Sequence, residues 1–339
     1  MSSIIQGPYF HDIQFQPQAL AATFATLDGL VLPPAPSGQA PLILTGMGAS
    51  LHALIPLQLQ LLNAGFLPLL METSELIHHA PAVLRAGATV VAVSQSGRSA
   101  ETLRMLEKLP AGVQVVGITN DATSPLAQQS SVALLTHAGP EATVSCKTYV
   151  SALMILRWLG SHWAGNDLGA ERAELALASE LVASYLGKLD DHVGELAQRL
   201  VETSLLYYAG RGPSLAAARA AGLITKEAAR FAAEGLSSAA FRHGPLEIVG
   251  PDVFLLVFEG LPQTAAINHG LVQDVVKRGG EAALCGPSGV GALQLPTVSP
   301  GLLPIVEILA AQMVTLALAA NQRHEAGHFA HAAKVTAVE

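Results

Sequence analysis

Charged side chains are scarce in this sequence. Lysine, arginine, aspartate and glutamate make up 13% of its 339 residues, and the formal net charge is −8. Because no basic stretch offsets that charge, the sequence excludes nucleic acid as an expected partner. Half of the residues are hydrophobic, so a chain of this length can bury the cores of two domains.

Cysteines and long apolar runs are also few. The two cysteines, Cys146 and Cys285, indicate neither a disulfide framework nor a zinc ribbon. The longest apolar runs are broken by Gly, Pro or polar residues before the roughly 20 residues that a membrane span needs. The N-terminal MSSIIQGPYFHDIQ lacks the basic and long apolar regions of a signal peptide. We therefore expect a soluble cytoplasmic protein without a membrane partner.

Apolar runs alternate with helix-like segments along the chain. The runs predict strands at 42–44, 89–93, 113–118 and 132–135, and the segments between them include helices at 51–64 and 100–108. This alternation is typical of a parallel sheet covered by helices on both faces.

The pattern is repeated with an offset of 164 residues. TGMGASLHA at 45–53 returns as AGRGPSLAA at 209–217, and Val93 falls on Val257 at the end of a second apolar run. We expect two tandem doubly wound, flavodoxin-like α/β units, each with three αβα layers. In each copy the Gly-x-Gly-x-Ser turn follows the first strand, where open α/β sheets bind ligands.

Hydroxyl groups crowd one turn of the first copy. In VAVSQSGRSAET, residues 91–102, Ser94, Ser96 and Ser99 separate a predicted strand from a predicted helix. Hydroxyls and backbone N–H groups at a helix N-terminus suit a phosphate, although a single serine there is usually only an N-cap. The second copy has FEGLPQ at 258–263 instead, so we expect one phosphate site per chain.

Several motifs carry a family resemblance. They are HDIQFQPQAL at 11–20, GMGAS at 46–50, SQSGRSAET at 94–102, KEAARFAAEGLSSAAFRHGPLEIV at 226–249 and HAAKVTAVE at 331–339. In this order they resemble the sugar isomerase (SIS) family, most closely the isomerase half of glucosamine-6-phosphate synthase and its stand-alone relatives. The resemblance covers nearly the whole chain.

The resemblance implies roles for individual residues. Glu227 matches the proton-transfer glutamate, His243 the ring-opening histidine that reaches a neighbouring subunit's site, and Lys334 the tail lysine that folds over the sugar. A homodimer is therefore implied. The implied substrate- and phosphate-binding residues are Gly48, Ser50, Ser94, Gln95, Ser96, Ser99, Ser145 and Glu234.

The chemistry of these residue types also fits sugar isomerisation when the family resemblance is left aside. A carboxylate shielded from water can carry a proton between adjacent carbons, histidine titrates near neutrality, and a lysine can stabilise an enediolate oxygen. Taken singly, each has an ordinary interpretation as a solvated helix glutamate, a turn histidine or a terminal charge. Their order and spacing favour function.

The resemblance also divides the chain into parts. We expect an N-terminal arm at 1–28, a first SIS domain at 29–170, a helical linker at 171–200, a second SIS domain at 201–325 and a tail over the active site at 326–339.

Two departures narrow the expected activity. The sequence contains no glutamine-hydrolysing domain with an N-terminal cysteine, and Ile224 stands where the synthase carries a lysine. We expect an enzyme that deaminates glucosamine-6-phosphate to fructose-6-phosphate and ammonia, without metal or organic cofactor. A fructosamine-6-phosphate deglycase, an aldose–ketose isomerase and a non-catalytic sugar-phosphate sensor remain alternatives.

Overall fold

The computed structural model describes residues 6–38, 40–331 and 333–336. The chain forms two compact units, each made of segments that are not consecutive in sequence. The five-stranded unit takes Gln18–Pro140, Cys146–Ala176 and His331–Glu339, and the four-stranded unit takes Met1–Pro17, Glu141–Ser145 and Leu177–Ala330.

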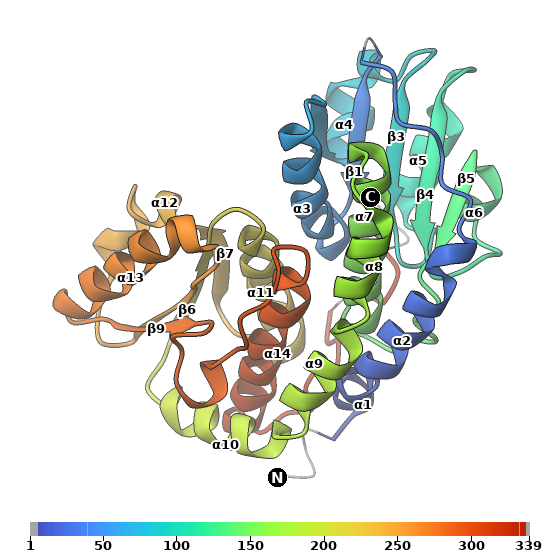
Figure 1. The fold of residues 1–339 in the computed structure, drawn as a ribbon. Coiled ribbons are helices and arrows are strands. Elements are labelled where there is room, and N and C mark those ends of the chain that lie inside the picture. Colours follow the sequence, from blue (N-terminus) through green and yellow to red (C-terminus); the bar gives the residue numbers. More distant parts are fainter. Residues whose placement is uncertain (1–5, 39, 332, 337–339) are drawn as a thin grey trace. The chain divides into compact units, whose positions relative to one another are not determined.

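The five-stranded unit contains a parallel sheet of order β2-β1-β3-β4-β5 (Figure 1). Its strands are β1 (Leu42–Gly46), β2 (Pro68–Glu72), β3 (Thr89–Val93), β4 (Gln114–Thr119) and β5 (Val132–Leu135). Every residue of β1 and β3 is buried, as expected for strands covered on both faces. The order is that of a flavodoxin-like sheet, which confirms the expected fold class.

Helices precede, connect and follow these strands. They are α2 (Gln16–Thr26), α3 (Ala49–Asn63), α4 (Thr73–His79), α5 (Ala100–Lys108), α6 (Pro125–Gln129), α7 (Lys147–Ala164) and α8 (Leu168–Leu175), with short 3₁₀ turns at Leu27–Gly29 and Pro81–Val83. Local chemistry sets several of their ends. The Ser124 hydroxyl accepts a hydrogen bond from the Ala127 N–H and caps α6. Gly165 adopts a left-handed conformation, with φ of 70°, and ends α7.

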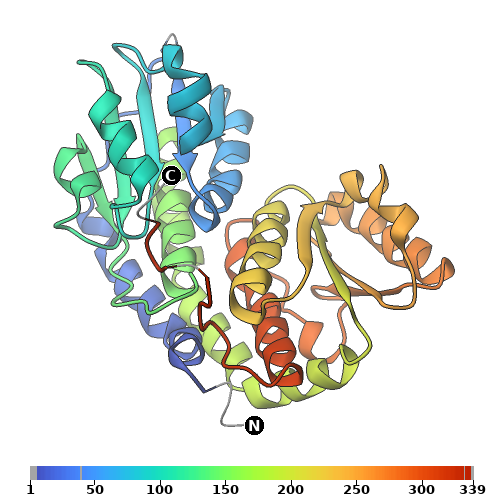
Figure 2. The same ribbon diagram turned by 180° about the vertical axis from the view of Figure 1, so that it is seen from behind.

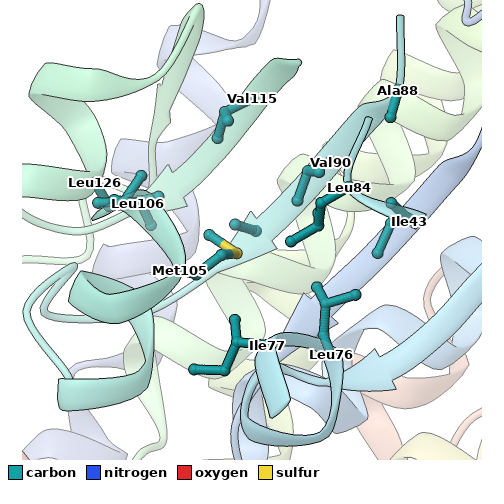
Figure 3. Packing of buried hydrophobic residues seen from close by; sticks show 11 residues of the cluster. Ile43, Leu76, Ile77, Leu84, Ala88, Val90, Met105, Leu106, Val115 and Leu126 are labelled. Carbon is teal, nitrogen blue, oxygen red and sulfur yellow. The ribbon is translucent and has the colours of Figure 1, made fainter. Parts of the chain in front are cut away.

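One face of this sheet packs against α4, α5 and α6 (Figure 3). Ile43, Val90 and Val115 project from three neighbouring strands into this cluster. The helices contribute Leu76, Ile77, Met105, Leu106 and Leu126. Each such side chain contributes about 1.5–3 kcal/mol when it is fully buried, so the cluster fixes α5, and with it the turn that precedes α5, on the sheet.

The four-stranded unit contains a parallel sheet of order β7-β6-β8-β9. Its strands are β6 (Leu205–Gly210), β7 (Ala233–Ser237), β8 (Val253–Phe258) and β9 (Glu281–Cys285). Its helices are α1 (Pro8–Gln14), α9 (Ala178–Leu186), α10 (Leu189–Arg199), α11 (Ser214–Ala229), α12 (Ser238–Phe241), α13 (Pro262–Lys277) and α14 (Leu303–Asn321), with 3₁₀ turns at Pro245–Ile248 and Gly291–Leu293. Because right-handed crossovers lead in opposite directions from β6 and β8, α11 and α13 cover opposite faces.

Helix α14 is a long and mostly apolar helix. Contrary to the expectation from the sequence, its 19 residues are long and apolar enough to cross a membrane by length and composition alone. However, 94% of that apolar window is buried inside the structure, and Figure 1 shows α14 beside α11 within the four-stranded unit. A buried core helix passes the same test, so α14 is weak evidence for a membrane span.

The structure confirms the internal repeat. The offset of 164 residues brings β1, α3 and β3 onto β6, α11 and β8. It also brings β2 onto β7, two strands that the sequence patterns had not indicated. The β2 strand reads PLLME and leaves four of its five residues partly or fully exposed, so it lacks the fully apolar pattern of its neighbours.

Two glycines allow α11 to approach β7 closely. A Cβ on Gly222 would lie 2.5 Å from the backbone nitrogen of Gly235, and a Cβ on Gly235 would overlap the carbonyl of Ala218. No real Cβ shows such contacts with backbone atoms, so a side chain at either position forces the helix away from the strand.

We therefore expect Gly222→Ala to lower the melting temperature, because overpacking costs about 1–3 kcal/mol and exceeds the gain in helix propensity. The matched control is Gly194→Ala on α10, where a Cβ meets nothing within 4 Å and the melting temperature should rise slightly. Thermal unfolding followed by circular dichroism compares the two variants. Equal effects of both would contradict the close-packing account.

Candidate active site

The candidate site of the five-stranded unit lies where the chain leaves β1 and β3. These two strands are neighbours, and Gly46 pairs with Val93 at their carboxyl ends. From β1 the chain continues to β2 on one side, and from β3 it continues to β4 on the other. The turns after β1 and β3 therefore emerge together at the topological switch point of the sheet, which is the usual ligand position in open α/β folds.

Glycines make room in the turn after β1. A Cβ on Gly46 would lie 2.9 Å from the carbonyl oxygen of Val93, so only glycine fits without a shift. Gly48 has a φ of 52° and precedes the first residue of α3. Ser50 lies in the first turn of that helix, with its N–H donating to the Met47 carbonyl at 3.0 Å.

The serine-rich turn after β3 is held by its own backbone. Ser94 is 8% exposed, and its carbonyl accepts from the N–H of Gly97 at 3.1 Å. The Ser96 hydroxyl oxygen accepts from the N–H of Arg98 at 3.2 Å. The Gln95 carbonyl accepts from the N–H of Asn120 at 3.0 Å, which ties the turn to the end of β4.

Ser99 caps the helix that follows this turn. Its hydroxyl oxygen accepts from the Thr102 N–H at 3.4 Å and lies 2.8 Å from the Thr102 hydroxyl. The N-terminus of α5 thus faces the same turn as the serines, and its aligned peptide dipoles favour an anion there. The N-cap interpretation and the phosphate interpretation are compatible, because Ser99 can serve both.

The C-terminal segment reaches the same helix. The Ala100 N–H, the first of α5, donates to the Thr336 carbonyl at 3.0 Å. Figure 2 shows this segment in dark red beside the five-stranded unit. Lys334 lies two residues before Thr336 and is half-buried. The part of the tail that the structure describes therefore contacts the first residue of α5, and the role of Lys334 stays a prediction.

The expected proton-transfer and ring-opening residues lie in the four-stranded unit. Glu227 is half-buried in the last turn of α11, and Glu234 is exposed on β7, 4.0 Å from the Lys226 amine. His243 is exposed and is the second residue after the end of α12. The preceding residue, Arg242, forms an ion pair with Asp274 of α13, and hydrogen bonding from Arg242 lowers the pKa of the Asp274 carboxyl.

The structure divides the sequence-predicted residues between the two units. The five-stranded unit holds Gly48, Ser50, Ser94, Gln95, Ser96, Ser99 and Lys334, and the four-stranded unit holds Ser145, Glu227, Glu234 and His243. Within the five-stranded unit, the hydroxyl residues gather at one switch point. Within the four-stranded unit, Glu227 lies at the end of α11 opposite to the turn that precedes that helix. The individual roles stay predictions.

The comparison with protein families identifies a domain within the chain. Residues 38–161 match the family model described as SIS domain. The chain contains a SIS domain.

Known proteins extend this match over most of the chain. It is 30% identical over 311 residues to a glutamine–fructose-6-phosphate aminotransferase (isomerizing) of Pyrococcus horikoshii, covering 88% of this chain and 52% of that protein. The corresponding enzyme of Pyrobaculum aerophilum is 27% identical over 353 residues, covering 98% of this chain and 58% of the relative. The chain thus spans about half the length of the curated relatives it matches.

Solved structures share the fold of both units. The C-terminal domain of glucosamine-fructose-6-phosphate aminotransferase from Francisella tularensis has a TM-score of 0.80 at 21% identity, covering 96% of this chain and 99% of that chain. Glucosamine-6-phosphate deaminase from Thermotoga maritima has a TM-score of 0.81 at 16% identity, covering 98% of this chain and 100% of that chain. These likenesses show the fold.

The second switch point of the chain contains carboxylates. After β6, the Ser214 hydroxyl donates to buried Glu307 of α14 at 2.8 Å. After β8, Glu259 accepts from the N–H and hydroxyl of Ser288, each at 2.7 Å, and contacts His269 at 2.8 Å. A phosphate dianion is repelled by an ionised carboxylate such as Glu259, so we expect phosphate at the first switch point alone.

Different environments give these two carboxyl groups opposite pKa shifts. Burial raises the pKa of Glu307 to about 8, against a smaller lowering by the Ser214 hydrogen bond. For Glu259, burial also raises the pKa, but the hydrogen bonds from Ser288 and His269 outweigh it and lower the pKa below its ordinary value. Glu307 is therefore mostly protonated at neutral pH, and Glu259 is ionised.

Sequence reasoning missed this second cluster. Glu307 is one acid within the apolar helix α14, and Glu259, His269 and Ser288 are spread over 30 residues. The offset of 164 residues was the available signal, because it places Glu259 opposite Gln95 of the serine-rich turn.

Glu307 makes a testable contribution to pH-dependent stability. Its pKa is higher in the folded chain than the ordinary value of 4.5, so its stabilising contribution is complete below about pH 4.5 and is lost as the pH rises through about 8. Relative to Glu307→Gln, the wild-type protein should lose roughly 3–5 kcal/mol of stability across this range. Melting temperatures of both proteins between pH 5 and 8.5 measure the difference, and parallel profiles would contradict the assignment.

Proposed function

We propose that this protein is a phosphosugar enzyme that converts glucosamine-6-phosphate to fructose-6-phosphate and ammonia. One observation carries the proposal: the turn that contains Ser94, Ser96 and Ser99 leads into the N-terminus of α5 at the switch point between β1 and β3. That arrangement suits the phosphate of a sugar phosphate. The names of the relatives support an amino-sugar phosphate, since they include an isomerizing aminotransferase and a glucosamine-6-phosphate deaminase.

The proposed reaction moves a proton from C2 to C1 and exchanges one group. His243 opens the pyranose ring. Glu227 removes the proton from C2 of the open-chain aldehyde and returns it to C1. The C1 oxygen gains a proton and the amine loses one, which leaves a hydroxyl at C1 and an imine at C2. Water adds to this imine, ammonia leaves, and the C2 ketone of fructose-6-phosphate remains. Lys334 and the tail cover the site and exclude bulk water during the enolamine stage.

The lack of a lysine at position 224 favours deamination of glucosamine-6-phosphate over its synthesis. Ile224 occupies the position at which the resemblance to the synthase implies a lysine, and its side chain is 1% exposed within α11. A buried isoleucine supplies no charge or proton to the substrate, so any step that requires a second cation is lost. Isomerisation and imine hydrolysis need Glu227, His243 and water alone in this proposal.

The deciding assay supplies purified protein with glucosamine-6-phosphate and without glutamine or added metal. We expect ammonia and fructose-6-phosphate in equal amounts. Glu227→Gln should lower turnover by about 10³-fold or more, with affinity changed only a few-fold, because the amide keeps the shape and loses the base. Exposed Glu202 provides the matched control, Glu202→Gln, which should retain full activity.

Two outcomes would redirect the proposal. Phosphosugar binding without ammonia release would favour the deglycase first, and then the sugar-phosphate sensor. Wild-type turnover by Glu227→Gln would remove Glu227 from the proton transfer.

We propose further that the protein acts in the cytoplasm as a homodimer whose His243 completes the site of the partner subunit. The exposure of His243, which follows α12 on the surface of its own unit, supports this arrangement.

Mixed dimers test the shared site. Glu227→Gln and His243→Ala should each be inactive alone. After the two variants are unfolded and refolded together in equal amounts, half of the dimers are mixed, and each mixed dimer has one intact site of two, so about a quarter of wild-type activity should return. Refolding of each variant alone is the control. A mixture that stays inactive while the mixed dimer forms would place both residues in the site of one chain.

A further inference from the structure

We propose that Thr102 is a positioning residue that turns the Ser99 hydroxyl toward the phosphate and makes the turn selective for dianionic phosphate. The inference rests on the proposed function, since it assigns a role within the same phosphate site. Thr102 is 5% exposed in the first turn of α5, so it acts through Ser99 and not by contact with the ligand.

The two Thr102 donors converge on one oxygen. The Thr102 N–H lies 3.4 Å and the Thr102 hydroxyl 2.8 Å from the Ser99 hydroxyl oxygen. A hydroxyl offers one proton and two lone pairs. When both Thr102 groups donate, both lone pairs of Ser99 are engaged, and its single proton remains to be donated out of the helix N-terminus.

A bound dianion fixes the direction of this chain of hydrogen bonds. If Ser99 donated to Thr102, a lone pair of Ser99 would face the phosphate oxygens, which also accept. The favourable order is therefore Thr102 to Ser99 to phosphate, in which each bond polarises and strengthens the next. Loss of the Thr102 hydroxyl frees the Ser99 proton to point elsewhere.

Ser96 presents its hydroxyl in a similar way. Its oxygen accepts from the Arg98 N–H at 3.2 Å, which leaves its proton for the ligand. A turn lined by hydrogen-bond donors matches the phosphate dianion, whose oxygens all accept hydrogen bonds. A protonated monoanion carries an O–H group, and this donor would face a donor of the turn, which is unfavourable. Since the second pKa of a phosphate monoester is about 6, affinity should fall as the pH decreases through that value.

The experiment measures the affinity for glucosamine-6-phosphate by calorimetry at pH 7.5 and pH 5.5, with inorganic phosphate as a second ligand. Thr102→Val should weaken binding about five- to tenfold at pH 7.5 and should reduce the loss of affinity at pH 5.5. Thr102→Ser, which keeps the hydroxyl, should restore both. In turnover, Thr102→Val should raise KM and leave kcat unchanged.

A matched control is available in the four-stranded unit. Thr264 occupies the same third position of a helix, α13, and its hydroxyl donates to the Leu261 carbonyl. Thr264→Val should leave phosphate affinity and its pH dependence unchanged. Should Thr102→Val fail to fold, Thr102→Cys, whose thiol is a weak donor, replaces it and should show the same direction of change.

A double-mutant cycle separates positioning from a general structural role. If Thr102 acts only through Ser99, Ser99→Ala and the double variant Ser99→Ala/Thr102→Val should bind phosphate equally. Equal affinity of wild type and Thr102→Val, or an undiminished effect of Thr102→Val without Ser99, would overturn this inference alone. Absence of phosphosugar binding by the wild-type protein would overturn the proposed function and this inference with it.

Discussion

The pairing of β1 with β3 is the constraint on which the candidate site depends. Gly46 stands opposite Val93 at the carboxyl ends of the two strands, and the approach is so close that a Cβ on Gly46 would meet the Val93 carbonyl. Because the strands are parallel and the chain leaves them toward opposite edges of the sheet, their turns emerge side by side. Every later feature of the site, from the serine turn to the cap of α5, builds on this position. The buried strands and the cluster in Figure 3 hold it in place.

The two units show how one fold supports two chemistries at equivalent positions. The first switch point presents hydroxyl and amide donors, and the second presents Glu259 and Glu307 with their own internal donors. The strand order is the same in both units from the first to the fourth strand in sequence. Function therefore follows from the residues at the turns and not from the fold alone.

Much of the fold could be predicted from the sequence because its strands carry a strong pattern. TVVAV at 89–93 is buried along its whole length, as its composition indicates. The repeat followed from the shared Gly-x-Gly-x-Ser turn, and the serine turn itself was recognised by its hydroxyls.

The β2 strand was not predicted from the sequence because it lies at a sheet edge and exposes most of its residues. The buried position of Glu307 and its hydrogen bond with Ser214 were not predicted, because both depend on tertiary packing. A single acid in an apolar helix does not reveal what surrounds it. Thr102 stands three residues after the capping serine, but its effect on the direction of a hydroxyl became visible only from the distances.

The two units interleave along the chain, and this has a consequence for synthesis on the ribosome. Residues up to 17 belong to the four-stranded unit, whose remaining parts are made much later, whereas the five-stranded unit receives its last segment from the extreme C-terminal part of the chain. The four-stranded unit therefore waits for residues up to 330, and the five-stranded unit waits for the segment that follows them. The hydrogen bond from Ala100 to Thr336 joins two parts of the five-stranded unit that are synthesised far apart in time. A nascent chain in which the first sheet has already formed still lacks the segment that contacts the first residue of α5.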